Sequence, residues 1–428
     1  MATAARELAE RQAVWQRVRV ARLETKLVAA AFVAVAVHIL DDNFFQPPPG
    51  TSAADHLVSG LVPVAVLVAI GWAYPRLRAG LRATIAVSFG ALGIVIGAIE
   101  AAYYWSSEGL SGDDFTGLLA AAGGAVLVVV GVAVAWHSRR LDHPVRRYLR
   151  RGLLLVGAAV TSFYVLFPLG LSYGFTHAAR TNTASGDLGA PYETVSFEAS
   201  DGLKLKGWFV PSTNGATVIV YPGKKGTQKH ARMLVRHGYG VLVFDRRGEG
   251  ESEGDPNALG WAFDRDLKGA LAFLRGRPDV DPQRVGGLGL SVGGEALLQT
   301  AAETKDLKAV VSDGAGARSV REDTIHTRAG KVPEIVLSSV ITAGVALFAN
   351  QAPPPSLEDL SGRITTPVFF VYARHGAGGE DNNPEYYDAA RGRKQIWKID
   401  TSHTHGLTDY PRQYDRRVVG FFNRTLLR

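Results

Sequence analysis

Hydrophobic residues are distributed unevenly along the 428-residue chain. Up to about residue 173 they form long, nearly uninterrupted runs at about 27–44, 57–74, 83–105, 116–136 and 152–173. Four of the runs reach the length of about 20 apolar residues that a transmembrane helix needs. The first is shorter, Leu27–Leu40, and ends in the sequence HILDDNFFQPPPG. The pattern predicts an α-helical membrane bundle over residues 1–176.

Beyond a linker of small and polar residues at 177–190, the apolar runs become shorter. YETVSFEASDGLKLKGWFVP alternates with period two around Asp201-Gly202, which predicts an antiparallel hairpin. Six β-type runs follow, separated by helix-like segments: ATVIVYP, GVLVFD, VGGLGL, KAVVSDG, TPVFFVY and KQIWKID. Near-continuous apolar strands between amphipathic helices are typical of a mostly parallel sheet covered on both faces. We therefore expect an α/β domain over residues 191–428.

The charged residues indicate how the predicted spans are oriented. Lys and Arg gather before the first run and after the second and fourth, whereas the other two connections carry only acidic charges. This alternation favours five spans, with the N-terminus in the cytoplasm and the α/β domain outside the cell membrane. Basic residues that contribute to the net charge of +7 thus lie in the N-terminal segment and in the loops between the predicted spans. We therefore expect contact with the lipid bilayer and none with nucleic acid.

Ionisable side chains lie in or beside the predicted spans: His38, Asp41, Asp42, His56 and Glu100. A polar group at membrane depth suggests a function. One interpretation is a cation site at the outer surface, built from the two histidines and two aspartates. The other places all but Glu100 at the membrane interface, with Glu100 reaching toward it. Without a defined ligand geometry we favour the second and predict no metal or organic cofactor. The absence of cysteine excludes disulfides and thiolate chemistry.

A candidate nucleophile stands between a predicted strand and a predicted helix. Gly289-Leu290-Ser291-Val292-Gly293 has the pattern G-x-S-x-G, which in this context predicts a nucleophile elbow. The Ser291 hydroxyl would lie at a helix N-terminus, where partial positive charge favours a developing anion. An oxyanion hole needs two N–H groups, which we expect from Val292 and from Lys224 in the loop VIVYPGKKG. A plain surface turn is the alternative for that loop.

The base and the acid should follow the serine, with the acid first. KQIWKID is followed by TSHTHGL, which contains His403 and His405. His403 is closer to the strand end and is the preferred base, with His405 as the alternative. The loop after TPVFFVY contains Glu380 and Asp381, and Glu380 is preferred because it directly follows a Gly-Gly bend. Asp313, after KAVVS, is the fallback acid.

At these residues the domain resembles the α/β-hydrolase superfamily, over about Pro191–Arg428. HGYGVLVFDRRGEGESEG is similar to the segment after the strand preceding the elbow, DVDPQRVGGLGLSVGGEA to the run into the elbow, and IDTSHTHGL to the C-terminal histidine loop. The nearest groups are the dienelactone-hydrolase-like and serine-aminopeptidase-like hydrolases. Two features depart from the superfamily: Pro222-Gly223 replaces the usual His-Gly of the oxyanion loop, and the acid loop lacks the Gly-x-x-Asp spacing.

The resemblance implies hydrolysis of an ester, thioester or amide, with a helical lid inserted at about 315–360. The apolar core of that insertion, Ile335–Ala349, is expected to cover the active site. We predict a membrane-anchored serine hydrolase acting on a small-molecule or lipid-like acyl substrate, with acyl esters preferred. Two alternatives stay open: an acyltransferase using the same acyl-enzyme, and a catalytically inactive hydrolase fold that binds or senses a ligand. The sequence makes no prediction of oligomeric state.

Overall fold

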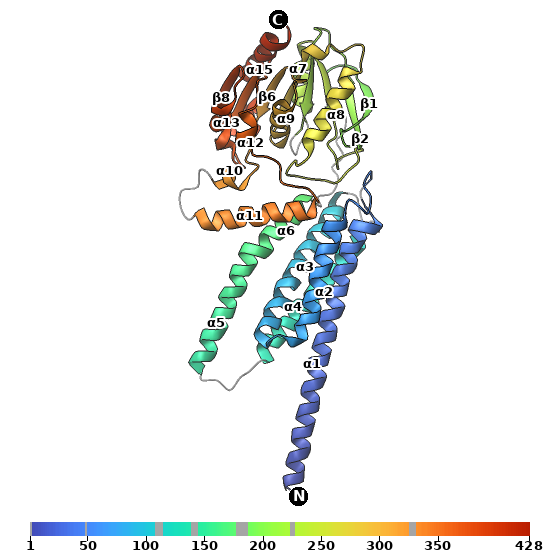
Figure 1. The fold of residues 1–428 in the computed structure, drawn as a ribbon, viewed down its shortest axis with the longest axis vertical. Coiled ribbons are helices and arrows are strands. Elements are labelled where there is room, and N and C mark those ends of the chain that lie inside the picture. The colour runs from blue at the N-terminus through green and yellow to red at the C-terminus, as the bar shows by residue number, and fades with distance from the viewer. Residues whose placement is uncertain are drawn as a thin grey trace. The chain divides into compact units, whose positions relative to one another are not determined.

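The computed structural model describes residues 2–47, 49–107, 114–137, 144–176, 187–222, 227–324 and 331–428. The chain forms two compact units, whose elements are labelled in Figure 1. The helical unit comprises Met1–Pro47, Ser52–Ala179 and Ala343–Asn350. The α/β unit comprises Pro48–Thr51, Arg180–Thr342 and Gln351–Arg428. Residues 343–350, in the middle of the segment between the sixth and seventh strands, thus belong to the helical unit.

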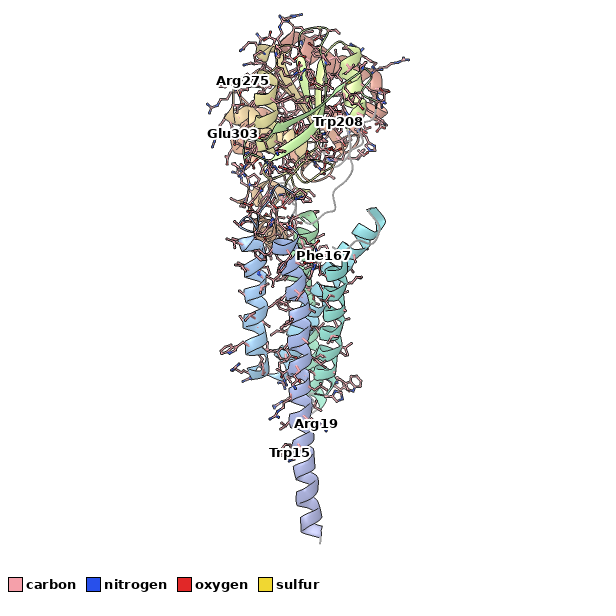
Figure 2. The ribbon with its side chains drawn as sticks, turned by 90° about the vertical axis from the view of Figure 1, so that its right-hand side faces the viewer. Trp15, Arg19, Phe167, Trp208, Arg275 and Glu303 are labelled. Atoms are coloured by element: carbon pink, nitrogen blue, oxygen red, sulfur yellow. The ribbon has the colours of Figure 1, made fainter. Side chains whose placement is uncertain are left out.

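The helical unit contains five stretches that are long and apolar enough to cross a membrane. They are Val18–Phe45, Leu57–Arg76, Ala79–Ala98, Thr116–His137 and Tyr148–Thr176. The short first run predicted from the sequence lies within a much longer helix, in whose N-terminal half the side chains of Trp15 and Arg19 are exposed (Figure 2). The elements are α1 (Ala2–Leu40), the π-helical η1 (Asp41–Phe45), α2 (Leu57–Ala73), η2 (Tyr74–Arg76), α3 (Ala79–Ser107), α4 (Asp114–His137), α5 (Pro144–Thr161), the π-helical η3 (Ser162–Leu166) and α6 (Phe167–Thr176).

Helices α3 and α4 pack with their backbones almost in contact. A Cβ atom added to Gly97 would lie 2.2 Å from the carbonyl oxygen of Gly117, and one added to Gly90 would lie 2.6 Å from that of Gly124. Small residues at a helix interface permit such a close approach. Close packing of this kind stabilises helix pairs in lipid, where the hydrophobic effect adds little to their association.

The α/β unit is built on one eight-stranded sheet with the order β1-β2-β4-β3-β5-β6-β7-β8. The predicted hairpin is present as β1 and β2, which pair antiparallel, and β2 also pairs antiparallel with β4. All other pairs are parallel, as the runs of apolar residues predicted. The strands are β1 (Glu193–Glu198), β2 (Lys204–Val210), β3 (Thr217–Tyr221), β4 (Gly240–Phe244), β5 (Val285–Leu290), β6 (Ala309–Asp313), β7 (Val368–His375) and β8 (Lys394–Ser402).

Helices cover both faces of this sheet (Figure 1). Alternate residues of β3 enter two different buried clusters, because neighbouring side chains of a strand point to opposite faces. One cluster includes side chains of α8, α9, α12 and α13, and the other those of α7 and α15. The helices of the unit are α7 (Gln228–Arg236), α8 (Phe263–Arg275), η4 (Pro282–Arg284), α9 (Val292–Glu303), α10 (Val320–Thr324), α11 (Lys331–Phe348, ending in the helical unit), α12 (Leu357–Ser361), η5 (Glu380–Asn382), α13 (Asn383–Ala389), α14 (Gly406–Asp409) and α15 (Pro411–Leu426).

Candidate active site

Ser291 occupies a strained turn between β5 and α9. Its backbone has φ 54° and ψ −126°, a region that L-residues other than glycine rarely adopt. The Ser291 N–H donates to the carbonyl oxygen of Asp313 at 2.8 Å, and the Ser291 carbonyl accepts from Gly294 N–H at 2.8 Å. Strain of this kind costs about 1–3 kcal/mol and persists where the surroundings enforce it, often at active sites.

The two glycines of the motif allow the turn to pack closely. A Cβ atom on Gly289 would lie 2.4 Å from the carbonyl oxygen of Gly293, and one on Gly293 would lie 2.7 Å from that of Pro222. Both distances are too short for any side chain. The G-x-S-x-G pattern therefore has the steric basis expected of a nucleophile elbow: α9 begins directly against β5 and the end of β3.

His403 follows β8 and lies between the serine and a carboxylate. Its Nε2 is 2.9 Å from Ser291 Oγ, and its Nδ1 is hydrogen-bonded to Glu380 Oε1. Glu380 is 2% exposed, and its second carboxylate oxygen accepts from Ala373 N–H at 2.7 Å. Serine, imidazole and carboxylate thus form one continuous hydrogen-bonded chain.

The acid loop is held in place from several sides. Gly379 has φ 86° and directly precedes η5, and this turn points the next side chain inward. Asn383 Nδ2 donates both to the Glu380 carbonyl oxygen at 2.8 Å and to that of Ala315 at 2.7 Å. A Cβ atom on Gly376 would lie 2.6 Å from Glu380 Cδ, so the backbone passes directly over the carboxyl group. The carboxylate has little freedom to move.

The electrostatics suit proton transfer from the serine. The hydrogen bond with Glu380 raises the pKa of His403 above its ordinary value, while burial of the ring works in the opposite direction. A more basic imidazole accepts the serine proton more readily, and the carboxylate stabilises the imidazolium that results.

The other acids and the other histidine named from the sequence lie elsewhere. Asp381 and His405 are exposed, and His405 precedes the first residue of α14. Asp313 is buried and accepts the Tyr414 hydroxyl at 2.7 Å, and burial raises its pKa to about 7. Its contact with the elbow is made by its backbone carbonyl, which fixes Ser291.

Of the two expected oxyanion donors, one can be placed. Val292 is the first residue of α9, so its N–H belongs to the first-turn amides that have no acceptor within the helix. Gly260, with φ +74°, approaches it so closely that an added Cβ would lie 3.0 Å from Val292 Cβ. Lys224 lies outside the described residues.

A buried polar network behind α9 was missed in the sequence. Glu295 Oε1 accepts from Gly316 N–H at 3.1 Å, and its Oε2 lies 3.6 Å from Arg318 Nε. Arg318 Nη1 donates to Gln299 Oε1 at 2.7 Å. Burial raises the pKa of Glu295 to about 7. The network ties α9 to the loop after β6, and Ala317 N–H in that loop donates to the Gly378 carbonyl oxygen at 2.7 Å. The spacing of four residues between Glu295 and Gln299, both on the buried side of α9, could have indicated this network from the sequence.

The ionisable residues near the junction of α1 and η1 contact one another and neighbouring hydroxyl groups. Among the described residues, no group of three or more His, Asp and Glu side chains is arranged to hold a metal ion. His38 is 1% exposed, and its Nδ1 lies 3.4 Å from Asp42 Oδ1. The Tyr173 hydroxyl donates to Asp42 Oδ2 at 3.1 Å, and Thr116 donates to Asp41 at the same distance. The Glu100 side chain lies outside the described residues.

Comparison with known proteins places this site in a family. The model of the X-Pro dipeptidyl-peptidase (S15) family matches residues 188–411, which include the elbow, the acid loop and His403. The chain belongs to this family. The S15-family domain has the α/β-hydrolase fold that the resemblance implied, and the protein is a serine hydrolase.

Individual relatives match about half of the chain. YfhR of Salmonella typhimurium is 34% identical over 268 residues, which cover 57% of this chain and 86% of YfhR. The thiohydrolase aneE of Aspergillus aculeatus is 28% identical over 215 residues, 46% of this chain and 64% of aneE. Among solved structures, the esterase Pf2001 of Pyrococcus furiosus has 22% identity and a TM-score of 0.49, covering 59% of this chain and all of Pf2001.

Proposed function

We propose that this S15-family protein is a membrane-anchored carboxylic ester hydrolase whose catalytic triad is Ser291, Glu380 and His403. One observation carries the proposal: the imidazole of His403 bonds through Nε2 to Ser291 Oγ and through Nδ1 to Glu380. A general base must lie within hydrogen-bond reach of the proton that it removes, and this one does.

The reaction follows from that geometry. His403 Nε2 takes the hydroxyl proton as Ser291 Oγ attacks the ester carbonyl, and Glu380 stabilises the imidazolium. The oxyanion is held by the N–H of Val292 and, in our proposal, by that of Lys224. The imidazolium then protonates the departing alcohol, which leaves an acyl-serine. Water, deprotonated by the same imidazole, attacks this ester and releases the acid with the serine restored.

An apolar acyl group is the preferred substrate. The helix α11, in the segment between β6 and β7, is apolar, and its side chains Val332, Ile335 and Val336 are 71%, 40% and 39% exposed. Such a surface suits a hydrocarbon chain better than a peptide. The family description supports a second candidate, cleavage of an amide after an X-Pro dipeptide, and the printed activity of aneE supports a thioester.

A substrate panel separates these candidates. The purified full chain and Ser291→Ala are assayed on p-nitrophenyl esters of increasing chain length, on acyl thioesters and on Ala-Pro-p-nitroanilide. We expect Ser291-dependent turnover that is highest on medium or long acyl esters. Faster turnover of the anilide would assign a peptidase. Preferential ester formation when glycerol is added would indicate an acyltransferase. A folded chain that turns over none of them would contradict the hydrolase mechanism and favour the inactive, ligand-binding alternative.

We further propose that five spans carry the chain across the cell membrane, with the N-terminus in the cytoplasm and the α/β unit outside. The distribution of Lys and Arg supports this orientation. Because the chain has no cysteine, single cysteines report on it cleanly. We expect a membrane-impermeant maleimide to label Arg275→Cys, on an exposed side chain of α8 (Figure 2), in intact cells. Arg78→Cys should be labelled only after permeabilisation, and the reverse pattern would overturn the proposed orientation.

A further inference from the structure

The helical unit contains a partly open cavity of about 390 Å³. Its walls come mainly from α1, α2, α3 and the segment running from α5 into α6, with smaller contributions from α4 (Ala120 and Leu127) and from the end of α11 (Leu347 and Phe348). On α3 the contributing residues recur every four positions, at Ser88, Leu92 and Ile96, which is the spacing of a single helical face. The volume lies near the lower end of the range of about 300–1,000 Å³ that is usual for small-molecule sites.

The cavity opens toward the surroundings of the helical unit. Val62, Val66 and Val165 line it and are 44%, 44% and 40% exposed. Along α1 and η1 the lining extends from Phe32 to Asn43, a rise of about 16 Å at the pitch of an α-helix. The cavity is therefore elongated along the helix axes, as an extended hydrocarbon chain would require.

Polar groups gather at one end of the cavity. His38, Asp42 and Asn43 come from the end of α1 and from η1, Ser59 from the start of α2, and Tyr173 from the end of α6. They are already organised by hydrogen bonds: Ser59 Oγ donates to Asn43 Oδ1 at 2.6 Å, and the Tyr173 hydroxyl to Asp42 Oδ2 at 3.1 Å. The π-helical turn η1 lies here, and such turns are frequent at functional sites.

Away from this end the lining is hydrocarbon, apart from the hydroxyl groups of Thr84, Ser88 and Thr161. Of the described residues that line the cavity, none is a lysine or an arginine. A phosphate or carboxylate head group would find His38 as its one cationic partner and would face the carboxylate of Asp42. Burial of an unpaired charge is costly, so an anionic ligand is disfavoured.

We propose that this cavity binds an uncharged single-chain amphiphile, such as a monoacylglycerol or a long-chain alcohol. The chain lies between α1, α2, α3 and α6, and the hydroxyl head group bonds at the end formed by Asp42, Asn43 and Tyr173. The volume suits one chain, whereas a phospholipid carries two. The inference does not rest on the triad, because a Ser291→Ala protein should bind this ligand equally well.

The test uses a 1-O-alkylglycerol ether with a diazirine in its dodecyl chain, which no esterase can hydrolyse. It is photo-crosslinked to the full Ser291→Ala chain in phosphatidylcholine nanodiscs, and labelled peptides are identified by mass spectrometry. We expect labels on the cavity faces of α1 and α3. Leu92→Trp fills the cavity and should reduce labelling by about tenfold or more, the effect of losing contact with two methylene groups. Val129→Trp, on an exposed position of α4 outside the lining, should leave labelling within about twofold.

Competition tests the charge preference. An unlabelled alkylglycerol should displace the probe at a lower concentration than dodecanoic acid or dodecyl phosphate does. Asp42→Asn removes a negative charge and should bring the displacing concentrations of the neutral and anionic competitors closer together. Uniform labelling of outward-facing residues, or equal effects of Leu92→Trp and Val129→Trp, would overturn the site. Displacement by the acid as efficient as by the alkylglycerol would overturn the assignment of an uncharged ligand. Esterase activity that fails while labelling persists would refute the proposed function alone.

Discussion

Replacing Glu380 by glutamine tests the orientation of the catalytic imidazole. Both carboxylate oxygens accept from donors: Oε1 from His403 Nδ1–H and Oε2 from the N–H of Ala373. Glutamine keeps the shape but has one acceptor oxygen and one NH₂ group. Since Gly376 packs against the carboxyl carbon, the amide has to remain in the same place. The amide oxygen can therefore accept from only one of the two donors, and the NH₂ group faces the other.

Each orientation of the amide impairs the reaction. If its oxygen accepts from Ala373, the NH₂ group faces His403 Nδ1, which must then be the unprotonated nitrogen. The proton sits on Nε2, and Nε2 can no longer accept from Ser291. If its oxygen faces His403 instead, the buried Ala373 N–H loses its acceptor, at a cost of about 1–3 kcal/mol.

The magnitude follows from these two effects. Loss of a charge-assisted hydrogen bond to the imidazolium removes about 1.5–3 kcal/mol of transition-state stabilisation. Together with the orientation penalty this amounts to about 2.5–6 kcal/mol, or roughly seventyfold to twenty-five-thousandfold in kcat/KM. The loss should appear mainly in kcat, because Glu380 does not bind the acyl group.

The assay is steady-state hydrolysis of p-nitrophenyl esters together with the rate of fluorophosphonate labelling. Asp381→Asn is the matched control, since it makes the same change of charge on an exposed neighbour and should leave activity within about twofold. Activity of Glu380→Gln within about threefold of the native protein would refute the orientation argument. So would an equal loss in Asp381→Asn.

Three further predictions concern protonation, strain and burial. The imidazole must be neutral to act as a base, so kcat/KM should rise with pH through a midpoint above the ordinary histidine pKa of about 6.5. Glu380→Gln should lower that midpoint. A midpoint at or below about 6.5 in the native protein would contradict a pKa raised by the hydrogen bond with Glu380. Ser291→Gly should be more stable than Ser291→Ala by about 1 kcal/mol in thermal unfolding, since both lack the hydroxyl but only glycine adopts φ 54° without strain; equal stabilities would show that the elbow is unstrained. Burial raises the pKa of Asp313 from 3.8 to about 7, so the folded state holds a proton that the unfolded state releases, and this group lowers stability as pH rises from about 4 to about 7. Asp313→Asn should therefore be more stable than the native protein at pH 8 and similar to it at pH 4, and the opposite pH trend in melting temperature would contradict a protonated Asp313.

The sequence predicted those features that depend on local order along the chain. The sheet and its opening hairpin follow from runs of apolar residues, and the elbow from five consecutive residues around Ser291. The choice between Glu380 and Asp381 was harder, because the φ of 86° at Gly379 and the turn η5 decide which neighbour points inward.

Other features depend on tertiary contacts that no local pattern reports. The bond between Arg318 and Gln299 joins residues 19 apart, from the loop after β6 and from α9. The apolar cavity needs residues from six separate helical segments. His38 was expected at the membrane interface, but its burial within the protein was not predicted: it is 1% exposed, and α6 brings the Tyr173 hydroxyl to within 3.4 Å of its Nε2.

The central claim is that Ser291 forms the acyl-enzyme, and trapping that adduct tests it most directly. The purified full chain is incubated with p-nitrophenyl dodecanoate or an alkyl fluorophosphonate, quenched in acid, digested and analysed by mass spectrometry. We predict an acyl or phosphonyl group on the peptide that contains Ser291, strongly reduced in His403→Ala and absent in Ser291→Ala. A folded native protein that carries no adduct, or one that carries it on another residue while Ser291→Ala still turns over the ester, would contradict the account.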